Sequence, residues 1–233
     1  MTRARSDCMC AKVTSPFILL IVIAAGASAQ PEETCVSYDP RYEEAPLMQV
    51  KAGVAQGKVH FQRRAEPCPP NPESCPSLQK AYLVPGDVVL AGSVVHGFRC
   101  AYYGTAKGDI AAGFLPANLL EPARNDGDLD SAFLSGTWTM LGQNPITFTA
   151  AGEKAVQATG MASWQGRPGV VHSGSFSARA RLQGDSAEFR DSAVGGTCEI
   201  KIRRRGPYLL VSDNNQCGGM NVRFQGIYVK RIK

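Results

Sequence analysis

The stretch S-D-N-N-Q-C-G-G-M-N-V-R-F-Q-G, from Ser212 to Gly226, carries residue types that could bind an ion or turn the chain. Carboxylate, amide and thiol groups are metal ligands, but one carboxylate is too few for a strong calcium site. Asn and Gly also supply the left-handed backbone conformations of a tight turn. We expect a structural turn here, and a loop that binds an anion or another ligand is the alternative.

A second candidate site is the segment W-Q-G-R-P-G-V-V-H-S-G, from Trp164 to Gly174. Its Gly and Pro residues predict the turn of a hairpin, and Trp164, Arg167 and His172 stand around that turn. They would suit a ligand-binding loop on the rim of a barrel, because an exposed Trp stacks on a sugar ring or an aromatic group. The alternative is that Trp164 folds into the core beneath the loop.

The run R-R-R, from Arg203 to Arg205, is the third candidate site. Guanidinium groups bind phosphate and carboxylate oxygens through paired hydrogen bonds. We therefore take Arg203 and Arg205 as candidate ligand-binding residues, with a solvated turn as the alternative.

Charge is divided unequally along the chain. Residues 30–135 hold 9 Lys and Arg against 13 Asp and Glu, a net charge of −4, whereas residues 136–233 hold 13 against 6, a net charge of +7. This division indicates a basic second half that meets an anionic partner. Attraction between the two halves, or charged faces that are merely solvated, would give the same division.

The sequence contains none of the common signatures of catalysis. It has no H-E-x-x-H, G-x-S-x-G or Gly-rich phosphate loop, and it has only three His. His60 and His96 stand in separate contexts, where ordinary surface or hydrogen-bonded roles are expected. We therefore expect no enzyme, no cofactor and no metal. If the chain is an enzyme or inhibits one, we assign that role to Trp164, Arg167 and His172.

Residues 1–29 have the parts of a secretory signal peptide. Basic residues precede the apolar run Phe17–Ala25, and Ala27–Ala29 reads A-S-A, a cleavage site. The apolar run is too short to span a bilayer core of roughly 30 Å. We expect an exported protein, periplasmic or secreted, whose mature chain begins at Gln30 and has no transmembrane segment.

Six of the eight cysteines follow the signal peptide. An even number in an exported chain predicts disulfide bonds rather than a zinc site, because the compartment is oxidising. If each half of the chain pairs its own cysteines, Cys198 has only Cys217 as a partner, and the 15 connectivities of six cysteines fall to three. That bond closes a loop of about 20 residues and should contribute about 3 kcal/mol through chain entropy.

Short alternating and apolar runs predict strands through most of the mature chain. Between residues 47 and 122 they surround a loop, C-P-P-N-P-E-S-C-P, whose prolines do not fit a sheet ladder. From 136 to 233 about eight runs alternate with Gly-rich turns, the pattern of an antiparallel barrel or sandwich. The polar stretch 123–135 is expected to be a linker. The sequence thus predicts an all-β fold, with an acidic leader at 30–46 and two β domains.

The segment G-F-L-P-A-N-L-L-E-P, from Gly113 to Pro122, resembles the Src-homology-three barrel in its bacterial, exported form. In that family a strand ending in Gly-aromatic-x-Pro runs into a single helical turn and a last strand. Exported members usually bind cell-wall peptides or other extended ligands in a shallow aromatic groove, so the resemblance implies such a groove within residues 47–122. The alternative is that these aromatic residues belong to the core. The residues implied to line the groove are Phe114, Pro116, Tyr82, and Tyr102 or Tyr103.

The strand assignment in this half also bears on its four cysteines. Cys100 lies on a central strand and is best placed to reach Cys35 in the leader. Cys68 and Cys75 flank the Pro-rich loop, which a bond between them would close. These two pairs are one of the three connectivities that stay open for this half, and the one that these positions favour.

The second half is similar to the calycin barrels, which include lipocalin-like proteins. The similarity rests on Gly136-Thr137-Trp138 in the first strand and Tyr228-Val229-Lys230-Arg231 in the last. In that family the Trp and a basic residue pack across the closed end of the barrel. The resemblance implies that Trp138 and Arg231 close the barrel and have no other role.

Together these features predict an exported, non-enzymatic binding protein of the cell envelope. Its expected partner is a cell-wall peptide or glycan, or another anionic envelope component, with a protein partner as the alternative. Two further functions fit the same features: a barrel that carries a small molecule or lipid, and an inhibitor of a wall hydrolase or a secreted enzyme. Nucleic acid is not expected as a partner of an exported protein with this charge balance.

Overall fold

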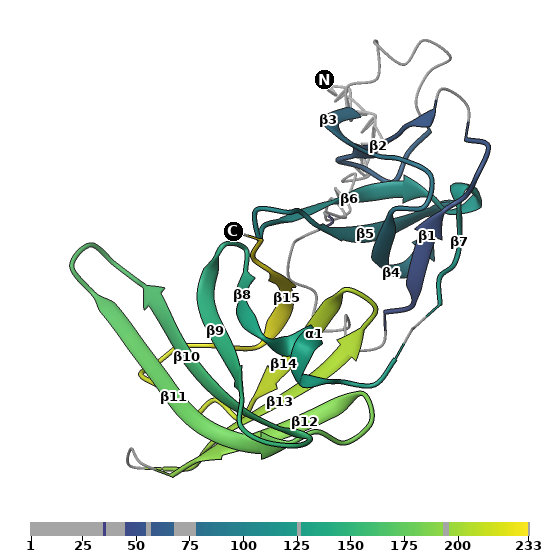
Figure 1. Ribbon diagram of the computed structural model, residues 1–233. Helices are drawn as coiled ribbons and strands as arrows, with labels where there is room; N and C mark the ends of the chain where they lie inside the picture. The colour runs from purple at the N-terminus through teal and green to yellow at the C-terminus, as the bar shows by residue number, and fades with distance from the viewer. Residues whose placement is uncertain are drawn as a thin grey trace, which may run out of the picture. The chain divides into compact units, whose positions relative to one another are not determined.

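A computed structural model describes residues 35, 45–54, 57–67, 78–124, 127–192 and 196–232. The described chain is all-β, as predicted, and its strands form two antiparallel sheets (Figure 1). Residues 33–233 form one compact unit. The predicted signal peptide, Cys68 and Cys75 lie outside the described residues. No helix in the described ranges has the length and apolarity needed to cross a bilayer.

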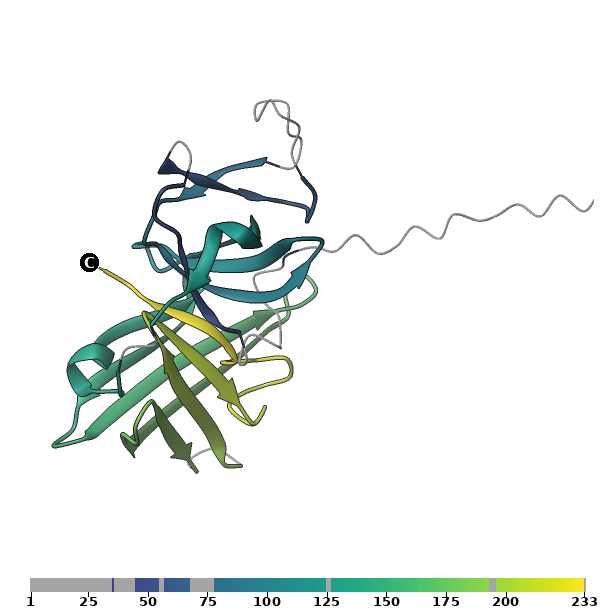
Figure 2. The ribbon, with the colours of Figure 1, turned by 90° about the vertical axis from the view of Figure 1, so that its right-hand side faces the viewer.

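The first sheet has seven strands in the order β3-β2-β6-β5-β4-β1-β7, drawn purple to teal in Figure 2. Its core contains Phe61, Leu83, Val89 and Leu115, all nearly inaccessible to solvent. The strands are β1 (Leu47–Val50), β2 (Val59–Gln62), β3 (Leu78–Leu83), β4 (Val88–Val95), β5 (Phe98–Gly104), β6 (Ile110–Pro116) and β7 (Leu120–Pro122).

The end of the first sheet follows the local structure expected from its Gly-Phe-Leu-Pro motif. Strand β6 ends at Pro116, a single 3-10 turn, η4 (Ala117–Leu119), follows at once, and β7 completes the sheet. Proline fixes its own φ near the value that a helical turn needs, and Pro116 stands at the N-cap of η4 with φ −57°. The order of strand, turn and strand is therefore confirmed.

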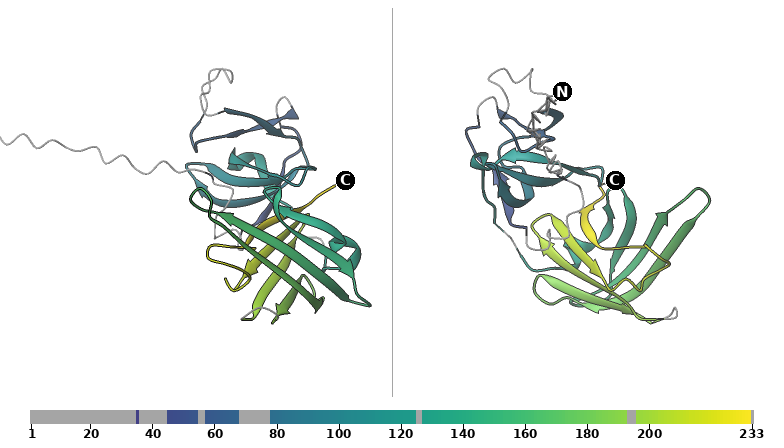
Figure 3. Two further views of the ribbon diagram at one scale, coloured as in Figure 1. Left: turned by 90° about the vertical axis from the view of Figure 1, so that its left-hand side faces the viewer. Right: turned by 180° about the vertical axis from the view of Figure 1, so that it is seen from behind.

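The second sheet has eight antiparallel strands in the order β11-β10-β9-β8-β15-β14-β13-β12 and curls until it is nearly closed into a barrel (Figures 1 and 3). All eight predicted strands are present. They are β8 (Gly136–Met140), β9 (Gln143–Ala150), β10 (Ala155–Gln165), β11 (Val171–Arg181), β12 (Ser186–Asp191), β13 (Cys198–Arg205), β14 (Tyr208–Asp213) and β15 (Gly226–Lys230).

Alternating residues of these strands fill the barrel. Along β11 the side chains of Phe176, Ala178 and Ala180 are buried and the residues between them are exposed. Aromatic side chains from β12 and from the loop before β15 meet them, and the Phe176 ring packs edge-on against Phe224 at 5.1 Å and near Phe189 at 6.5 Å. Small and large residues thus interlock across the barrel, and the inward positions form one hydrophobic cluster.

Strands β11 and β12 stand at the two ends of the sheet order, so the barrel has a seam between them. A side-chain hydrogen bond, rather than a ladder of backbone hydrogen bonds, connects the two strands here. The Ser177 backbone N–H of β11 donates to Asp191 Oδ2 of β12 at 2.7 Å. Beyond the end of β12, an isolated β-bridge between Gly174 and Gly218 holds the loop between β14 and β15, here called the C-terminal loop, against β11.

One end of the barrel is covered by the short helix α1 (Ser131–Leu134). Trp138 is fully buried, and its indole Nε1–H donates to the Leu134 carbonyl at 2.8 Å. Lys230 Nζ lies 5.8 Å from the Trp138 ring and donates to the Phe133 carbonyl at 2.7 Å. Trp138 therefore closes this end as expected, but the basic residue over it is Lys230 and not Arg231. Residues alternate in direction along a strand, and Arg231 follows Lys230 directly.

The segment predicted to be a linker is partly built into the barrel. Leu129 and Leu134 belong to the barrel's hydrophobic cluster. The Arg204 guanidinium stacks 3.8 Å from the centre of the Phe133 ring and donates to the Asp128 carbonyl at 2.9 Å. Two leucines within a polar stretch thus attach it to the second sheet.

A third buried cluster joins the two sheets. Leu47, Leu90 and Tyr102 from the first sheet pack with Tyr208 and Val229 from the second. The Tyr208 hydroxyl donates to the Val88 carbonyl at 2.6 Å and accepts from the Gly104 N–H at 3.2 Å. The contact is therefore apolar, with a buried phenol hydrogen-bonded across it.

Two disulfides lie within the described residues. Cys35 is bonded to Cys100 and Cys198 to Cys217, with Cα–Cα distances of 5.3 and 4.5 Å. Both predicted pairs are confirmed. In each case the two cysteines lie within the same half of the chain.

Candidate binding surface at the open end of the barrel

The hairpin of β10 and β11 projects at the end of the barrel opposite α1 and carries the predicted Trp164 site. Trp164 stands directly across from His172 in the register of the two strands. The Trp164 ring lies over Gly166, where any added Cβ would come within 2.5 Å of the indole. Gly166 thus allows the indole to fold back over the turn, while 36% of the residue stays exposed.

His172 connects the hairpin to the C-terminal loop. Its ring lies 5.4 Å from that of Trp164, in a tilted arrangement. Its Nδ1 lies 2.6 Å from the Met220 carbonyl oxygen, so Nδ1 carries the proton and donates it. This bond fixes the orientation of the imidazole and holds the loop beside Trp164. Arg167 lies in the exposed turn between the strands.

Several apolar side chains are exposed at this tip and on the loop beside it; Trp164 shares a face of the hairpin with His172, whereas Val171 lies on the opposite face. Val171 is 62% exposed and Met220 is 74% exposed, and Val170 and Trp164 are also open to solvent. We call Trp164, Arg167, Val170, Val171 and Met220 the hairpin-tip surface. Several exposed apolar side chains at one tip favour an interaction site, whereas a single one is ordinary.

The loop after β14 owes its shape to Asp213. One carboxylate oxygen of Asp213 accepts from the N–H groups of Phe224 at 2.5 Å and Gln225 at 3.0 Å, and the other accepts from the Asn215 N–H at 2.7 Å. Asn215 and Asn221 take the left-handed conformation, with φ of 62° and 66°. The carboxylate thus joins the two ends of the loop.

Asn214 fixes the loop to the start of β13. Its side-chain oxygen accepts from the Glu199 N–H at 3.1 Å and the Gln216 N–H at 3.2 Å, and its Nδ2 donates to the Thr197 carbonyl at 2.7 Å. The disulfide of Cys217 joins the same two segments. The side chains of Asp213 and Asn214 are therefore used in backbone hydrogen bonds, and the expected structural turn is confirmed.

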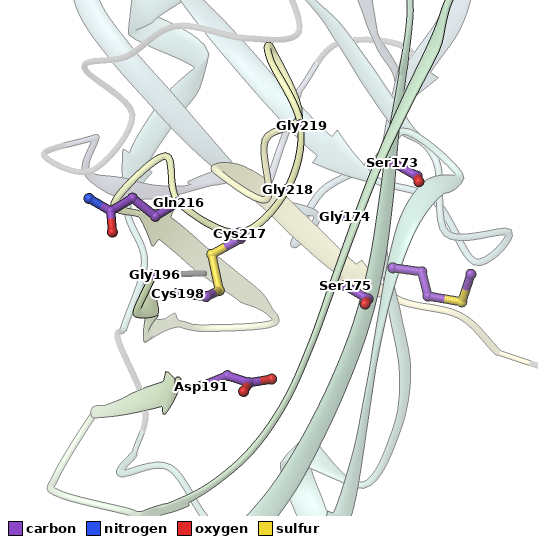
Figure 4. Close-up of a pocket in the computed structure, with 11 residues that line it drawn as sticks. Ser173, Gly174, Ser175, Asp191, Gly196, Cys198, Gln216, Cys217, Gly218 and Gly219 are labelled. Atoms are coloured by element: carbon purple, nitrogen blue, oxygen red, sulfur yellow. A yellow bond between two sulfur atoms is a disulfide. The ribbon is translucent and has the colours of Figure 1, made fainter. Parts of the chain in front are cut away.

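A pocket of about 370 Å³ opens between this loop and the edge of β11 (Figure 4). Ser173 and Ser175 lie on the strand, and Gln216 and the disulfide lie across from them. Asp191, at the end of β12, lies below. The lining offers hydroxyl, amide, carboxylate and main-chain groups, a polar set that suits hydrogen bonding.

Two glycines allow the loop to approach β11 so closely. A Cβ at Gly174 would lie 2.2 Å from the Cys217 carbonyl oxygen, and one at Gly218 would lie 2.6 Å from the Gly174 Cα. The Gly219 N–H donates to the Ser173 carbonyl at 3.2 Å across this contact. Gly174 and Gly218 thus let the backbone of the loop meet the backbone of β11.

Of the residues implied to line a groove on the first sheet, two are buried, and Tyr103 is half-buried with its hydroxyl 3.4 Å from Asp87 Oδ1. Tyr102 is 2% exposed and packs in the contact between the sheets, and Phe114 is buried as well. Pro116 is half-buried at the cap of η4. Tyr82 is 45% exposed, with Lys58 Nζ 4.3 Å above its ring and the His60 ring 5.4 Å away.

Arg203 and Arg205 converge on one carboxylate. Asp185 Oδ2 lies 3.4 Å from Arg203 Nε and 3.6 Å from an Arg205 Nη. Arg204, between them, points elsewhere and stacks on Phe133. The structure thus brings together the two predicted members of the arginine run and separates the third.

Comparison with protein-family models, with curated proteins and with solved structures finds no match to this chain. Within the described ranges, no three His, Cys, Asp or Glu side chains are grouped as metal ligands would be.

Sequence reasoning missed Met220 and the two valines of the hairpin-tip surface. Val170 and Val171 directly follow the Pro-Gly turn. An apolar pair placed directly after a turn, where polar residues are usual, was a signal for exposure. Met220 carried no such signal, because only the fold brings its loop beside the hairpin.

Proposed function

We propose that this chain is an exported, non-enzymatic binding protein of the cell envelope, and that its hairpin-tip surface docks on an acidic protein. The observation that carries the proposal is the exposed apolar group around Trp164, held in place by His172. Export is supported by the two disulfides, which form in oxidising compartments.

The chemistry of the surface favours a protein over a glycan. Trp, Met and Arg are the residue types enriched in the cores of protein interfaces. Sugars would use the indole and polar neighbours but would gain little from Val170, Val171 and Met220. The +7 charge of residues 136–233 favours a partner with an acidic rim.

The proposal can be tested by site-specific photocrosslinking of the full chain in the cells that produce it. A photoreactive phenylalanine analogue would replace Val171, which is exposed within the hairpin-tip surface. Thr159, exposed on the same hairpin but away from its tip, is the matched control. We expect one discrete protein adduct from position 171, and we expect Trp164→Ala in the same chain to reduce it.

Equal adducts from positions 171 and 159, or no protein adduct from 171, would contradict the proposal. A shift to polysaccharide-sized material at 171 would identify a glycan instead and would equally overturn the protein assignment. Unfolding of the Trp164→Ala chain, measured by circular dichroism, separates loss of fold from loss of contact.

A wall glycan or wall peptide bound by the first sheet is the second candidate function. The observation that favours it is the exposed Tyr82 with Lys58 and His60 beside it, an aromatic face next to a cation. Purified chain should then be retained by isolated cell wall at low salt, and Tyr82→Ala should abolish retention. Lack of retention at both low and high salt would rule this candidate out.

A ligand-carrying barrel is not part of the proposal. Carriage would require space among the inward side chains, but the inward positions of β8–β15 pack as one buried cluster. An inhibitor of a wall hydrolase is one form of the protein-binding function, and a lysozyme-type turnover assay with excess chain tests it.

A further inference from the structure

A shallow pocket of about 270 Å³ lies on the outer face of the barrel, over β12, β13 and β14. Cross-strand pairing sets its layout: Arg203 stands between Ser186 and Leu210, and Lys201 stands beside Ser212. Buried Leu210 forms part of the floor. The described lining residues are Ser186, Lys201, Ile202, Arg203, Leu210 and Ser212, and they include two cations and no carboxylate.

Lys201 and Arg203, the two cations at this pocket, have N–H donors that no described residue occupies. Arg203 meets Asp185 only through Nε, at 3.4 Å, and in the described part of the chain its two Nη groups have no bonded partner. Lys201 Nζ has no hydrogen bond or ion pair within 4 Å of a described residue, but Glu188, across from it on β12, is close enough to attract it electrostatically. Ser212 adds a hydroxyl. The Ser186 hydroxyl donates to the Gln183 carbonyl at 3.2 Å and is already used.

The neighbouring charges show why these two cations differ from the rest of the face. Arg190, on β12, is bonded to Glu188 at 2.6 Å and lies 3.6 Å from Glu199. Asp185 is shared between Arg203 and Arg205, so one negative charge faces two positive ones. Positive charge is therefore left uncompensated on the side of Arg203 that faces the pocket.

We propose that this pocket binds a phosphate group, through Lys201, Arg203 and Ser212. A planar guanidinium can give two parallel N–H bonds to adjacent phosphate oxygens, an ammonium acts as a point charge, and a hydroxyl donates to a further oxygen. Three donors of different geometry around a concave surface match an anion with several terminal oxygens. The ligand is inorganic phosphate or a phosphate carried by a lipid headgroup, and the site is separate from the hairpin-tip surface.

The test is a titration of the full mature chain with inorganic phosphate, followed by backbone amide NMR and compared with sodium chloride at equal ionic strength. Saturable shifts are expected at the lining residues of β12–β14. Arg203→Gln and Lys201→Gln should each weaken binding about tenfold, the usual effect of losing a charged hydrogen bond. Arg203→Lys keeps the positive charge but loses the paired N–H donors of the guanidinium. Its phosphate affinity should therefore lie between those of the wild-type chain and Arg203→Gln.

Arg190→Gln is the matched control, because Arg190 lies on the same face but is already paired. It should change phosphate affinity by less than about twofold. Equal effects of Arg190→Gln and Arg203→Gln, or shifts that sodium chloride reproduces, would overturn the proposal. Sedimentation with phosphatidylglycerol or phosphatidylcholine vesicles then assigns the source: binding to the former alone, lost in Arg203→Gln, identifies a lipid phosphate, and binding to neither identifies the free anion.

Discussion

Replacing Tyr208 by Phe removes a single oxygen atom from the contact between the two sheets. That oxygen donates to the Val88 carbonyl at 2.6 Å and accepts from the Gly104 N–H at 3.2 Å. Tyr208 is 1% exposed, and its two partners, Val88 and Gly104, are half-buried. The ring and its apolar contacts stay, which isolates the polar part of the contact.

The magnitude follows from two partly buried groups that lose their partner. Each unsatisfied buried group costs about 1–3 kcal/mol, so we expect Tyr208→Phe to lower the free energy of unfolding by about 3 kcal/mol. For a chain of this size about 1 kcal/mol corresponds to about 2–4 °C, which gives a fall in Tm of about 6–12 °C. Tyr82→Phe, at an exposed ring, should cost less than about 0.5 kcal/mol.

The pH dependence provides a second check. Burial raises the pKa of the Tyr208 phenol above its ordinary value. An unfolded tyrosine ionises near pH 10, so this term stabilises the fold fully below that pH and is lost as the pH rises further. The loss of stability above about pH 10 should therefore be smaller in Tyr208→Phe than in the wild-type chain.

Urea unfolding followed by circular dichroism and by the fluorescence of buried Trp138 gives both quantities. A free energy change below about 1 kcal/mol for Tyr208→Phe would refute the reasoning, because it would mean that Val88 and Gly104 find water or other partners. An equal effect of Tyr82→Phe would refute it as well.

Two further predictions concern the loop that faces β11. Replacing Cys198 and Cys217 together by Ala should lower the free energy of unfolding by about 3 kcal/mol, because the bond closes a loop with a sequence separation of 19. The Asn214 hydrogen bonds still hold the loop in this variant. A loss below about 1 kcal/mol, measured by urea unfolding, would contradict the entropic account. Gly174→Ala places a Cβ 2.2 Å from the Cys217 carbonyl, so it should cost about 1–3 kcal/mol and speed hydrogen exchange at the Gly219 amide, whereas Ser173→Ala beside it should change neither by much.

The strands could be predicted because their signals are local. Ile200 and Ile202 alternate with charged residues, and the structure buries both in β13. The turns between strands are likewise predictable from their glycines. Gly206 has a φ of 53°, a conformation that glycine adopts readily. The pairing of Cys198 with Cys217 needed only the division of the chain into two halves.

The candidate groove shows where local signals fail. Tyr102 and Phe114 lie within apolar strand segments, and a strand pattern says only which neighbours share their face. Which face meets a second sheet depends on contacts with residues about 100 positions away. One example is the hydrogen bond from the Tyr208 hydroxyl to the Tyr102 carbonyl oxygen, at 3.3 Å. Tyr102, one of the residues implied to line a groove, is used by the fold as part of this contact.

The sequence by itself determined the all-β class, the positions of the eight barrel strands, the pairing of Cys198 with Cys217 and the turn chemistry around Asp213, because each depends on side-chain alternation, turn residues or cysteines close in the chain. Only the tertiary structure decided that Lys230 covers Trp138, that Met220 joins Trp164 on one surface, and that one face of the first sheet is covered by the second. These depend on sheet curvature and strand order, which arise from many non-local contacts acting together, and no short stretch of residues encodes them.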